Sequence, residues 1–250
     1  MCGRFTLTQD RKAIIDDLDV AEWEAAAEHR PRFNVAPTQP ALTLTGSGAA
    51  PGSHRVVHEM RWGLVPGWAA DPSTASKRIN ARAETLVEKP SFRNLVPRRR
   101  CVVVADGFFE WQRSAAGAQP YYIHTPGRAL LPMAGLWDRW KGPGGEVLTT
   151  FTIVTTAASN GISWLHDRMP AILERGELDG WLDTERVPVE DAMALIKPFA
   201  GALEIEPVSK LVNSPRYDSA EVIRRVEPEP AVQGSLDFSG GCSSPPTRPE

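Results

Sequence analysis

Cysteine is scarce in this sequence, and no long apolar run is present. Three cysteines occur among the 250 residues, at Cys2, Cys101 and Cys242, and none belongs to a Cys-x-x-Cys pair. An odd and widely spaced set argues against a disulfide framework and against a zinc ribbon. No apolar run approaches the roughly 18 residues needed to span a membrane, and the first residues lack the apolar stretch of a secretory signal peptide. We therefore expect a cytoplasmic, monomeric protein that contacts no membrane.

A large net charge is also lacking, because the formal value is −3. The average hides two opposite segments, since residues 77–100 hold eight bases against two acids, whereas residues 227–250 hold four acids and one base. The basic segment permits a phosphate-binding face, although a run of this kind is equally typical of a solvated surface. Its bases are Lys77, Arg78, Arg82, Lys89, Arg93, Arg98, Arg99 and Arg100.

Short runs rich in β-branched residues dominate the rest of the chain. The runs predict strands over residues 41–44, 55–60, 101–104, 121–125 and 147–156. Helical patterns are fewer, at residues 10–18 and 189–200. Because helices and strands do not alternate regularly, the sequence predicts an α+β fold with mostly antiparallel strands. We expect one domain over residues 1–226 and a disordered tail over 227–250, which is rich in Pro, Gly and Ser.

Cys2 stands next to the initiator methionine, and removal of Met1 would leave a free α-amine beside a thiol. The α-amine has a pKa of roughly 7.7–8.0, so a useful fraction is neutral near pH 7 and can attack an aldehyde. The thiol can then close onto the imine and form a five-membered thiazolidine. The alternative is a chance cysteine at this position. The strand-like start at Phe5 indicates a terminus that is held in place.

Three further segments contain residues suited to chemistry. Glu110 stands among aromatic residues, a setting that suits a carboxyl group to proton transfer, or else it is an edge-strand residue with its head in water. His166 follows the long strand and is flanked by charges of both signs, although a lone histidine is more often structural. Asn80 lies between two arginines and is alternatively the N-cap of a helix.

Other side chains could contact a nucleic acid. Arg4 could hold a phosphate, and several tryptophans could stack on bases, although we expect most of them in the core. Trp68, in a Pro-Gly-Trp turn, is the tryptophan expected to be exposed. His54, His58 and His124 show no spacing typical of a metal site, so we expect neither a metal nor a cofactor.

Taken together, these segments resemble the SOS-response-associated peptidase (SRAP) family. The resemblance covers nearly all of the chain before the tail, and each string alone would be weak, whereas eight in the family's order are specific. The strings are MCGRF (1–5), FNVAPTQ (33–39), RWGLVPGW (61–68), INARAET (79–85), GFFEW (107–111), TTAAS (155–159), HDRMP (166–170) and VNSPR (212–216).

The resemblance implies a barrel-like core of strands with peripheral helices, and a sensor of abasic sites in single-stranded DNA that forms a thiazolidine through its N-terminal cysteine. Carried onto this chain, it makes Cys2 the nucleophile and Asn80 a group that positions the terminus and the opened sugar. Glu110 would be the general acid and base, and His166 would assist ring opening. Arg4, Arg82 and Arg168 would bind the phosphates that flank the lesion.

Two alternatives compete with this interpretation. One is a cysteine peptidase with a triad-like set of Cys2, His166 and Glu110, for which the sequence shows neither an oxyanion hole nor a peptide cleft. The family name records such an activity, namely thiol autoproteolysis that releases the leader before Cys2. The other alternative is a DNA-binding module in which Cys2 plays no part.

The tail contains a pattern outside the family's strings. Gln233, Leu236 and Phe238 form a Gln-x-x-Leu-x-Phe string that resembles the short peptides by which bacterial replication and repair proteins dock on the sliding clamp. Two large apolar anchors in a disordered segment suit binding in a pocket. The alternative is a chance match, because short patterns with three fixed positions are common. Clamp docking, and nucleoid association in a bacterium, would concentrate the protein where single-stranded DNA arises.

Overall fold

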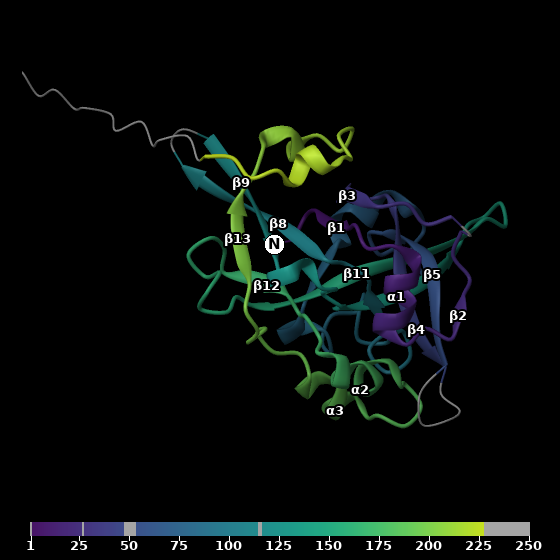
Figure 1. Ribbon diagram of the computed structural model, residues 1–250. Coiled ribbons are helices and arrows are strands. Elements are labelled where there is room, and N and C mark those ends of the chain that lie inside the picture. The colour runs from purple at the N-terminus through teal and green to yellow at the C-terminus, as the bar shows by residue number, and fades with distance from the viewer. Residues whose placement is uncertain (1, 27, 48–53, 115–116, 228–250) are drawn as a thin grey trace, which may run out of the picture.

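Two β-sheets packed against each other form the body of the molecule, and short helices lie at its periphery (Figure 1). The computed structural model describes residues 2–26, 28–47, 54–114 and 117–227. The tail string with Gln233, Leu236 and Phe238 lies outside the described residues. The boundary between a domain and a tail near residue 226 stays a prediction.

Five strands of the larger sheet close into a barrel. They are β4 (Pro40–Ser47), β5 (His54–Trp62), β7 (Arg100–Val103), β10 (Met133–Lys141) and β11 (Val147–Ala157). Neighbours pair antiparallel in the order β11-β10-β7-β4-β5. The ring closes where β5 pairs with β11 in parallel, with Arg61 opposite Thr150 and Trp62 opposite Phe151. Three short strands extend this sheet, namely β2 (Glu22–Trp23), β6 (Asn80–Arg82) and β12 (Arg168–Pro170).

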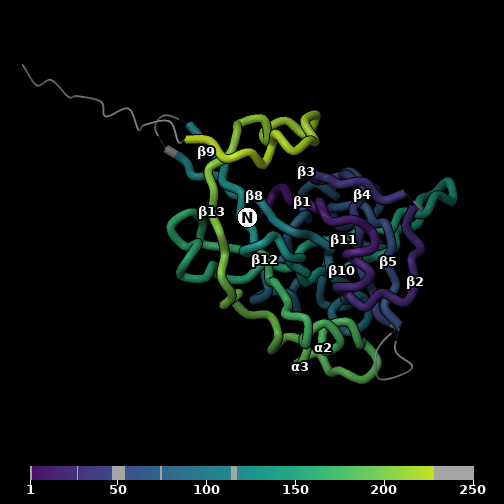
Figure 2. The backbone as a smooth tube through the Cα atoms, viewed as in Figure 1, coloured from purple at the N-terminus to yellow at the C-terminus, as the bar shows by residue number. Residues whose placement is uncertain are grey.

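The second sheet has five strands in the order β13-β9-β8-β1-β3. They are β1 (Phe5–Leu7), β3 (Arg32–Val35), β8 (Gly107–Ser114), β9 (Gly117–His124) and β13 (Glu204–Pro207). In Figure 2 the chain leaves the lower helices and returns as light-green β13 along β9, with which it pairs antiparallel. The first strand, β1, is therefore an inner strand held by β3 and β8, as expected for a terminus that is tied down.

The helices are short and peripheral, as expected. In α1 (Arg11–Leu18) the side chain of Asp10 accepts a hydrogen bond from the backbone N–H of Ala13 at 2.8 Å, which caps the first turn. The other α-helices are α2 (Leu178–Leu182) and α3 (Val189–Ala194), and 3₁₀ turns cover Pro72–Arg78, Ala83–Thr85, Pro126–Arg128, Arg175–Glu177, Lys210–Asn213 and Ala220–Ile223.

The predicted helix over 189–200 was too long. The α-helix ends at Ala194 and is followed by a tighter turn in which the N–H of Ile196 donates to the carbonyl of Met193 at 3.1 Å. Pro198 explains the early end, because the residue before a proline avoids the helical region and the proline lacks an N–H. The five predicted strands are confirmed in β4, β5, β7, β9 and β11, although β7 ends at Val103 and β9 ends at His124, each one residue earlier than predicted.

The barrel strands bury both faces. Side chains on one face of the barrel strands, such as Leu42, Leu44 and Val102, pack with buried residues of the helices. Side chains on the other face, such as Met60 and Cys101, pack with Phe5 and Phe108 of the second sheet and with Cys2, which precedes that sheet's strand β1. This alternation follows from the two-residue period of a strand. The N-terminal segment is thus built into the core between the sheets.

One member of the predicted basic segment is not on the surface. Arg100 is buried, and its guanidinium donates to the backbone carbonyls of Trp181 (2.5 Å), Val96 (3.0 Å) and Asp183 (2.6 Å). It therefore anchors α2 to the barrel and does not belong to a phosphate-binding face. In the described part of the chain, no helix is both long enough and apolar enough to cross a membrane.

Candidate active site

Cys2 lies three residues before the inner strand β1 and is fully buried. Its Sγ donates a hydrogen bond to the backbone carbonyl of Arg4 at 3.5 Å. Burial raises the pKa of the Cys2 thiol, and the nearby carboxylate of Glu110 raises it further. The N-terminal amine and the Arg4 hydrogen bond oppose this rise with smaller effects. The thiol is consequently protonated at neutral pH and needs a base before it can act as a nucleophile.

Asn80 holds the backbone next to the thiol. Its Nδ2 donates to the carbonyl oxygen of Cys2 at 2.8 Å, across 78 positions of sequence. Asn80 begins strand β6, which pairs in parallel with β11, so the alternative of a helix N-cap is wrong. Its Oδ1 atom is buried and accepts no hydrogen bond from any described residue. A buried amide acceptor with unused capacity beside Cys2 is available to a ligand or to a new N–H donor.

Glu110 lies on β8, which is placed between β9 and β1 in the sheet. Only 3% of the surface of Glu110 is exposed. The alternative of an edge-strand glutamate with its head in water is therefore wrong. The first residue of β8, Gly107, explains part of the close packing, because a Cβ there would lie 2.4 Å from the ring of Tyr122. Only glycine lets β8 pass this ring at such a distance, and β8 in turn carries Glu110 next to Cys2.

His166 lies in the connection between β11 and β12. Its Nδ1 accepts a hydrogen bond from the backbone N–H of Arg168 at 2.9 Å, and an oxygen of Asp167 lies 2.8 Å from the same nitrogen. Nδ1 is the acceptor in the contact with Arg168, because a backbone N–H can only donate, and in this arrangement Nε2 is the ring nitrogen with the donor role.

Glu110 and His166 line the same open cavity, which we call the Glu110 cavity and which has a volume of about 920 Å³. Its wall consists of Glu110, Trp111, Gln112, Arg113, Ala118, Trp164, Leu165 and His166. Glu110 is the link between this cavity and the buried Cys2. The structure thus brings Cys2, Asn80 and Glu110 together, and places His166 on the cavity wall with Glu110.

The predicted DNA-binding residues lie in different settings. Arg82 is exposed and lies two positions from Asn80 on β6, so both residues share a face of that strand. Arg168 is largely buried and donates to both carboxylate oxygens of Glu84, at 2.6 and 3.0 Å, and to the carbonyl of Thr155 at 2.6 Å. A phosphate contact by Arg168 stays a prediction and would have to share the guanidinium with Glu84.

Arg4 is engaged inside the protein. Its guanidinium donates to Oδ1 of Asn34 at 2.9 Å, to the carbonyl of Val212, and to the carbonyl of Asn213 at 3.2 Å. The bonds to Val212 and Asn213 tie the N-terminal segment to the 3₁₀ turn Lys210–Asn213, whose last two residues begin the VNSPR string. A phosphate contact by Arg4 stays a prediction, and the geometry favours a structural role.

Trp68 is 66% exposed, as the sequence predicted. It does not line the Glu110 cavity, and the neighbouring Gly67 donates its N–H to Asp138 of β10 at 2.7 Å. Trp164, at 52% exposed, lies on the wall of that cavity. Trp164 was one of several tryptophans that could stack on bases, but the sequence indicated only Trp68 as exposed, although the position of Trp164 two residues before His166 was a usable signal. Sequence reasoning missed Glu84, the partner of Arg168, because the two are 84 positions apart.

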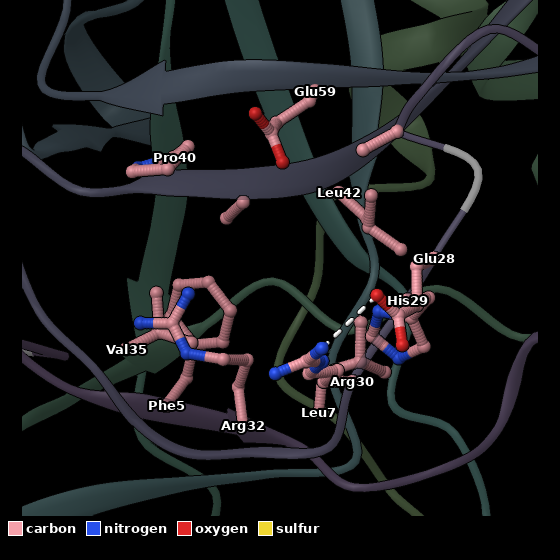
Figure 3. A pocket seen from close by; sticks show the side chains of 12 residues that line it. Phe5, Leu7, Glu28, His29, Arg30, Arg32, Val35, Pro40, Leu42 and Glu59 are labelled. Atoms are coloured by element: carbon pink, nitrogen blue, oxygen red, sulfur yellow. Dashed lines mark hydrogen bonds and ion pairs between the residues drawn. The ribbon is translucent and has the colours of Figure 1, made fainter. Parts of the chain in front are cut away.

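A second cavity, which we call the Phe5 cavity, has a volume of about 200 Å³ and contains none of the predicted catalytic residues (Figure 3). Apolar side chains, including Phe5, Leu7 and Leu42, form much of its lining. Both arginines of its lining are paired with carboxylates: Arg30 pairs with Glu28 at 3.0 Å, as the dashed line in Figure 3 shows, and Arg32 pairs with Asp218 at 2.5 Å.

The sequence that forms this site matches a known protein family. The model of the SOS response associated peptidase (SRAP) family matches residues 1–215, a span that includes every residue of the site. The chain belongs to the SRAP family. The resemblance that the eight strings indicated is therefore confirmed.

Relatives of this SRAP domain include abasic site processing proteins. The protein YoqW of Bacillus subtilis is 40% identical over 225 residues, which cover 89% of this chain and 99% of YoqW. The protein HMCES of Gallus gallus is 41% identical over 234 residues, which cover 82% of this chain and 69% of HMCES. Both carry the name abasic site processing protein.

Solved structures share the SRAP fold. A crystal structure of a protein from Bacteroides thetaiotaomicron superposes with a TM-score of 0.77 at 27% identity, covering 90% of this chain and all of that one. A second, from Bordetella bronchiseptica, superposes with a TM-score of 0.69 at 25% identity, covering 83% of this chain and all of that one. The mixed fold with a barrel-like core and peripheral helices is thus confirmed.

Proposed function

We propose that this protein captures abasic sites in single-stranded DNA by forming a thiazolidine between Cys2 and the opened sugar. Membership in the SRAP family and the names of the relatives support the substrate. The observation that carries the proposal is the meeting of Cys2, Asn80 and Glu110 at one point, with Glu110 also on the wall of an open cavity. A carboxylate beside the buried thiol can take the proton that the sulfur loses when it attacks.

The reaction begins with the α-amine, which becomes free when Met1 is removed. The amine nitrogen attacks the aldehyde carbon of the ring-opened sugar to give a carbinolamine, and loss of one water leaves an imine. The sulfur of Cys2 then bonds to the imine carbon, and the thiol proton moves to the nitrogen. One water is lost in total, and no oxidant or reductant is needed.

The raised pKa of the Cys2 thiol sets this order of events. A protonated thiol is a poor nucleophile. An α-amine whose pKa is near the pH of the solution is partly neutral, so it reacts first. Glu110, next to the thiol, takes its proton as the sulfur attacks, and earlier donates a proton to the departing hydroxyl. Cys2 is thus protected from unwanted oxidation until an imine is present.

The remaining residues position the substrate. His166 donates a proton through Nε2 to the ring oxygen of the sugar and favours the open aldehyde form. Asn80 holds the Cys2 carbonyl with its Nδ2, and its buried Oδ1 accepts a hydrogen bond from the α-amine or from a sugar hydroxyl. Held in this way, amine and aldehyde gain the advantage of an intramolecular reaction.

Phosphate contacts give affinity without sequence preference, which suits a lesion that can arise anywhere. Arg82 is the best placed of the predicted residues, because it is exposed and shares a face of β6 with Asn80. The abasic nucleotide has no base to unstack, so its sugar enters a cavity at lower cost than that of an intact nucleotide.

The experiment that tests the proposal uses the purified protein, a labelled single strand with one abasic site, and denaturing gel electrophoresis. We expect a covalent product with the wild type and none with Cys2→Ala, although Cys2→Ala still binds the DNA in anisotropy titrations. A covalent product of equal yield with Cys2→Ala would overturn the proposal. Cleavage of added protein substrates in place of crosslinking would favour the peptidase alternative.

The tail string is a separate proposal. We expect a peptide of residues 232–239 to bind the sliding clamp of the source organism with micromolar affinity in isothermal titration. The double variant Leu236→Ala and Phe238→Ala removes both apolar anchors and should abolish this binding. Absence of binding by the unchanged peptide would reduce the string to a chance match.

A further inference from the structure

Trp164 is an exposed aromatic side chain on the wall of the Glu110 cavity, two positions from His166. Half of its surface is open, whereas Trp62 and Trp181 are fully buried. Single exposed apolar side chains are common, but this tryptophan lies on the wall that also carries Glu110 and His166, where its ring is available to a ligand.

The indole is held in place before any ligand arrives. Its Nε1 donates to the carbonyl of Gly161 at 3.1 Å, within a tight turn in which the N–H groups of Ile162 and Ser163 donate to the carbonyl of Ser159 at 3.0 Å. The ring of Tyr121 contacts it at 5.3 Å between centroids and at 88° between planes. A ring fixed at two points loses little conformational entropy when a partner stacks on it.

The contact with Tyr121 leaves room for such a partner. In a perpendicular contact the edge of one ring meets the face of the other, so at least one face of the indole is not covered by Tyr121. Tyr121 is itself fixed, because it pairs with Glu110 across β8 and β9 and its hydroxyl donates to Gln112 at 3.2 Å. The platform is therefore coupled to the strand that carries the general acid and base.

The surroundings of Trp164 suit nucleic acid. Arg113 lies on the same wall and offers a positive charge for a phosphate, and Trp111 adds a second aromatic ring, whose Nε1 donates to Asn213 at 2.7 Å. Aromatic faces combined with cationic side chains are the means by which proteins bind single strands without reading sequence.

We propose that Trp164 forms a stacking subsite for the nucleobase adjacent to the abasic site. The inference rests on the proposed function for the identity of the DNA, and adds how the strand is held. With the lesion sugar at Glu110 and His166, the neighbouring nucleotide reaches Trp164 within the same cavity. A purine there overlaps the indole more than a pyrimidine does, so the lesion context affects affinity.

The test is a double-mutant cycle between Trp164 and the neighbouring base. The DNA is a single strand with a tetrahydrofuran abasic analogue, which lacks the aldehyde and so reports non-covalent binding. In further strands the nucleotide on the 5′ side, or the one on the 3′ side, is also replaced by the analogue. Wild type, Trp164→Ala and Trp164→Phe are titrated by fluorescence anisotropy.

We expect removal of one neighbouring base to weaken binding by the wild type by about tenfold, a typical loss for one base–aromatic stack. Trp164→Ala should lose about the same factor with that base present and little more when it is removed. Trp164→Phe should lie between the two. Equal effects of base removal in wild type and Trp164→Ala, on both sides, would overturn the proposal.

Two controls complete the design. Val147→Ser removes an exposed apolar side chain outside the Glu110 cavity and should leave every affinity unchanged. Saturating amounts of natural abasic DNA should still give the Cys2-dependent covalent product with Trp164→Ala, because stacking affects binding and not the chemistry. Loss of crosslinking by the wild type would contradict the proposed function, whereas an absent coupling with crosslinking intact would contradict only the stacking subsite.

Discussion

The Glu110 cavity and the Phe5 cavity contain the same types of ionisable residue, yet they are organised differently. Each is lined by arginine, glutamate and histidine. In the Phe5 cavity the arginines are engaged by carboxylates, and His29 is bound to the carbonyl of Gln9 at 3.0 Å. In the Glu110 cavity the carboxylate faces a buried thiol. Residue types alone therefore do not mark a site; what marks it is a nucleophile beside a group that can take its proton.

Burial acts in opposite ways in these two regions. It lowers the pKa of His29 and so keeps that ring neutral, with its hydrogen bond to Gln9 as a lesser, opposing effect. It raises the pKa of the Cys2 thiol, and Glu110 adds to the rise. In the first case burial stabilises a structural contact. In the second it stores a nucleophile in its inactive form until a base removes the proton.

The largest expected effect is that of Glu110→Gln, which keeps the shape of the side chain and removes its proton-transfer capacity. We expect crosslinking to slow by about 10²-fold under single-turnover conditions, as is typical for loss of a general acid or base. The matched control is Glu59→Gln in the Phe5 cavity, which should react at the wild-type rate. Equal rates for both variants would remove the distinction between the cavities.

A smaller effect is expected for His166→Ala. Ring opening should slow by about tenfold, because water in the open cavity replaces part of the proton donation. Rapid quenching followed by gel electrophoresis measures this rate. Its counterpart, His29→Ala, changes a residue bound to Gln9 and should leave the rate unchanged, so a slow His29→Ala variant with a normal fold would count against the assignment.

For DNA affinity, the comparison is between Arg82 on β6 and Arg30 in the Phe5 cavity. Arg82→Ala should weaken binding to all single strands and reduce the slope of log K against log salt by about one unit, because one phosphate contact is lost. Arg30 is paired with Glu28, so Arg30→Ala should leave the slope unchanged. Anisotropy titrations at several salt concentrations decide, and a loss that depends on base sequence would contradict the phosphate role.

The smallest effect concerns stability at low pH. Hydrogen bonds from Arg168 lower the pKa of Glu84 below its usual range. A lowered folded-state pKa contributes stability that is present above the unfolded value of about 4.3 and is lost as the pH falls below it. Urea unfolding should therefore show a steeper loss of stability on acidification in wild type than in Glu84→Gln. Because Glu84 is 55% exposed, the difference is modest, and identical profiles would contradict it.

Local patterns in the sequence predicted much of the fold, and longer-range pairing could not be predicted. Alternating β-branched residues located five strands, and the helical spacing of apolar residues located α1, since both signals are local. The barrel closes where β5 pairs in parallel with β11, and these segments lie 89 positions apart. Neither segment alone contains a pattern that predicts this pairing.

The sequence predicted which residues form the site, but it did not predict which contacts they make. The family strings named Cys2, Asn80 and Glu110, which the structure brings together. They did not reveal that Arg100 is buried under α2 or that Arg168 is held by Glu84, because partners of a charged side chain are set by tertiary packing. The exposed fraction of Trp164 is likewise set by tertiary packing, so composition did not separate it from the tryptophans expected in the core.

The most direct test of the central claim is the mass and location of the covalent product. The protein is mixed with an abasic oligonucleotide, and the adduct is analysed intact and then by tandem mass spectrometry of its peptides. The account predicts a protein that begins at Cys2, an adduct mass equal to protein plus DNA minus one water, and attachment at Cys2 through both nitrogen and sulfur. Crosslinking by a protein that retains Met1, or attachment at a lysine, would contradict it.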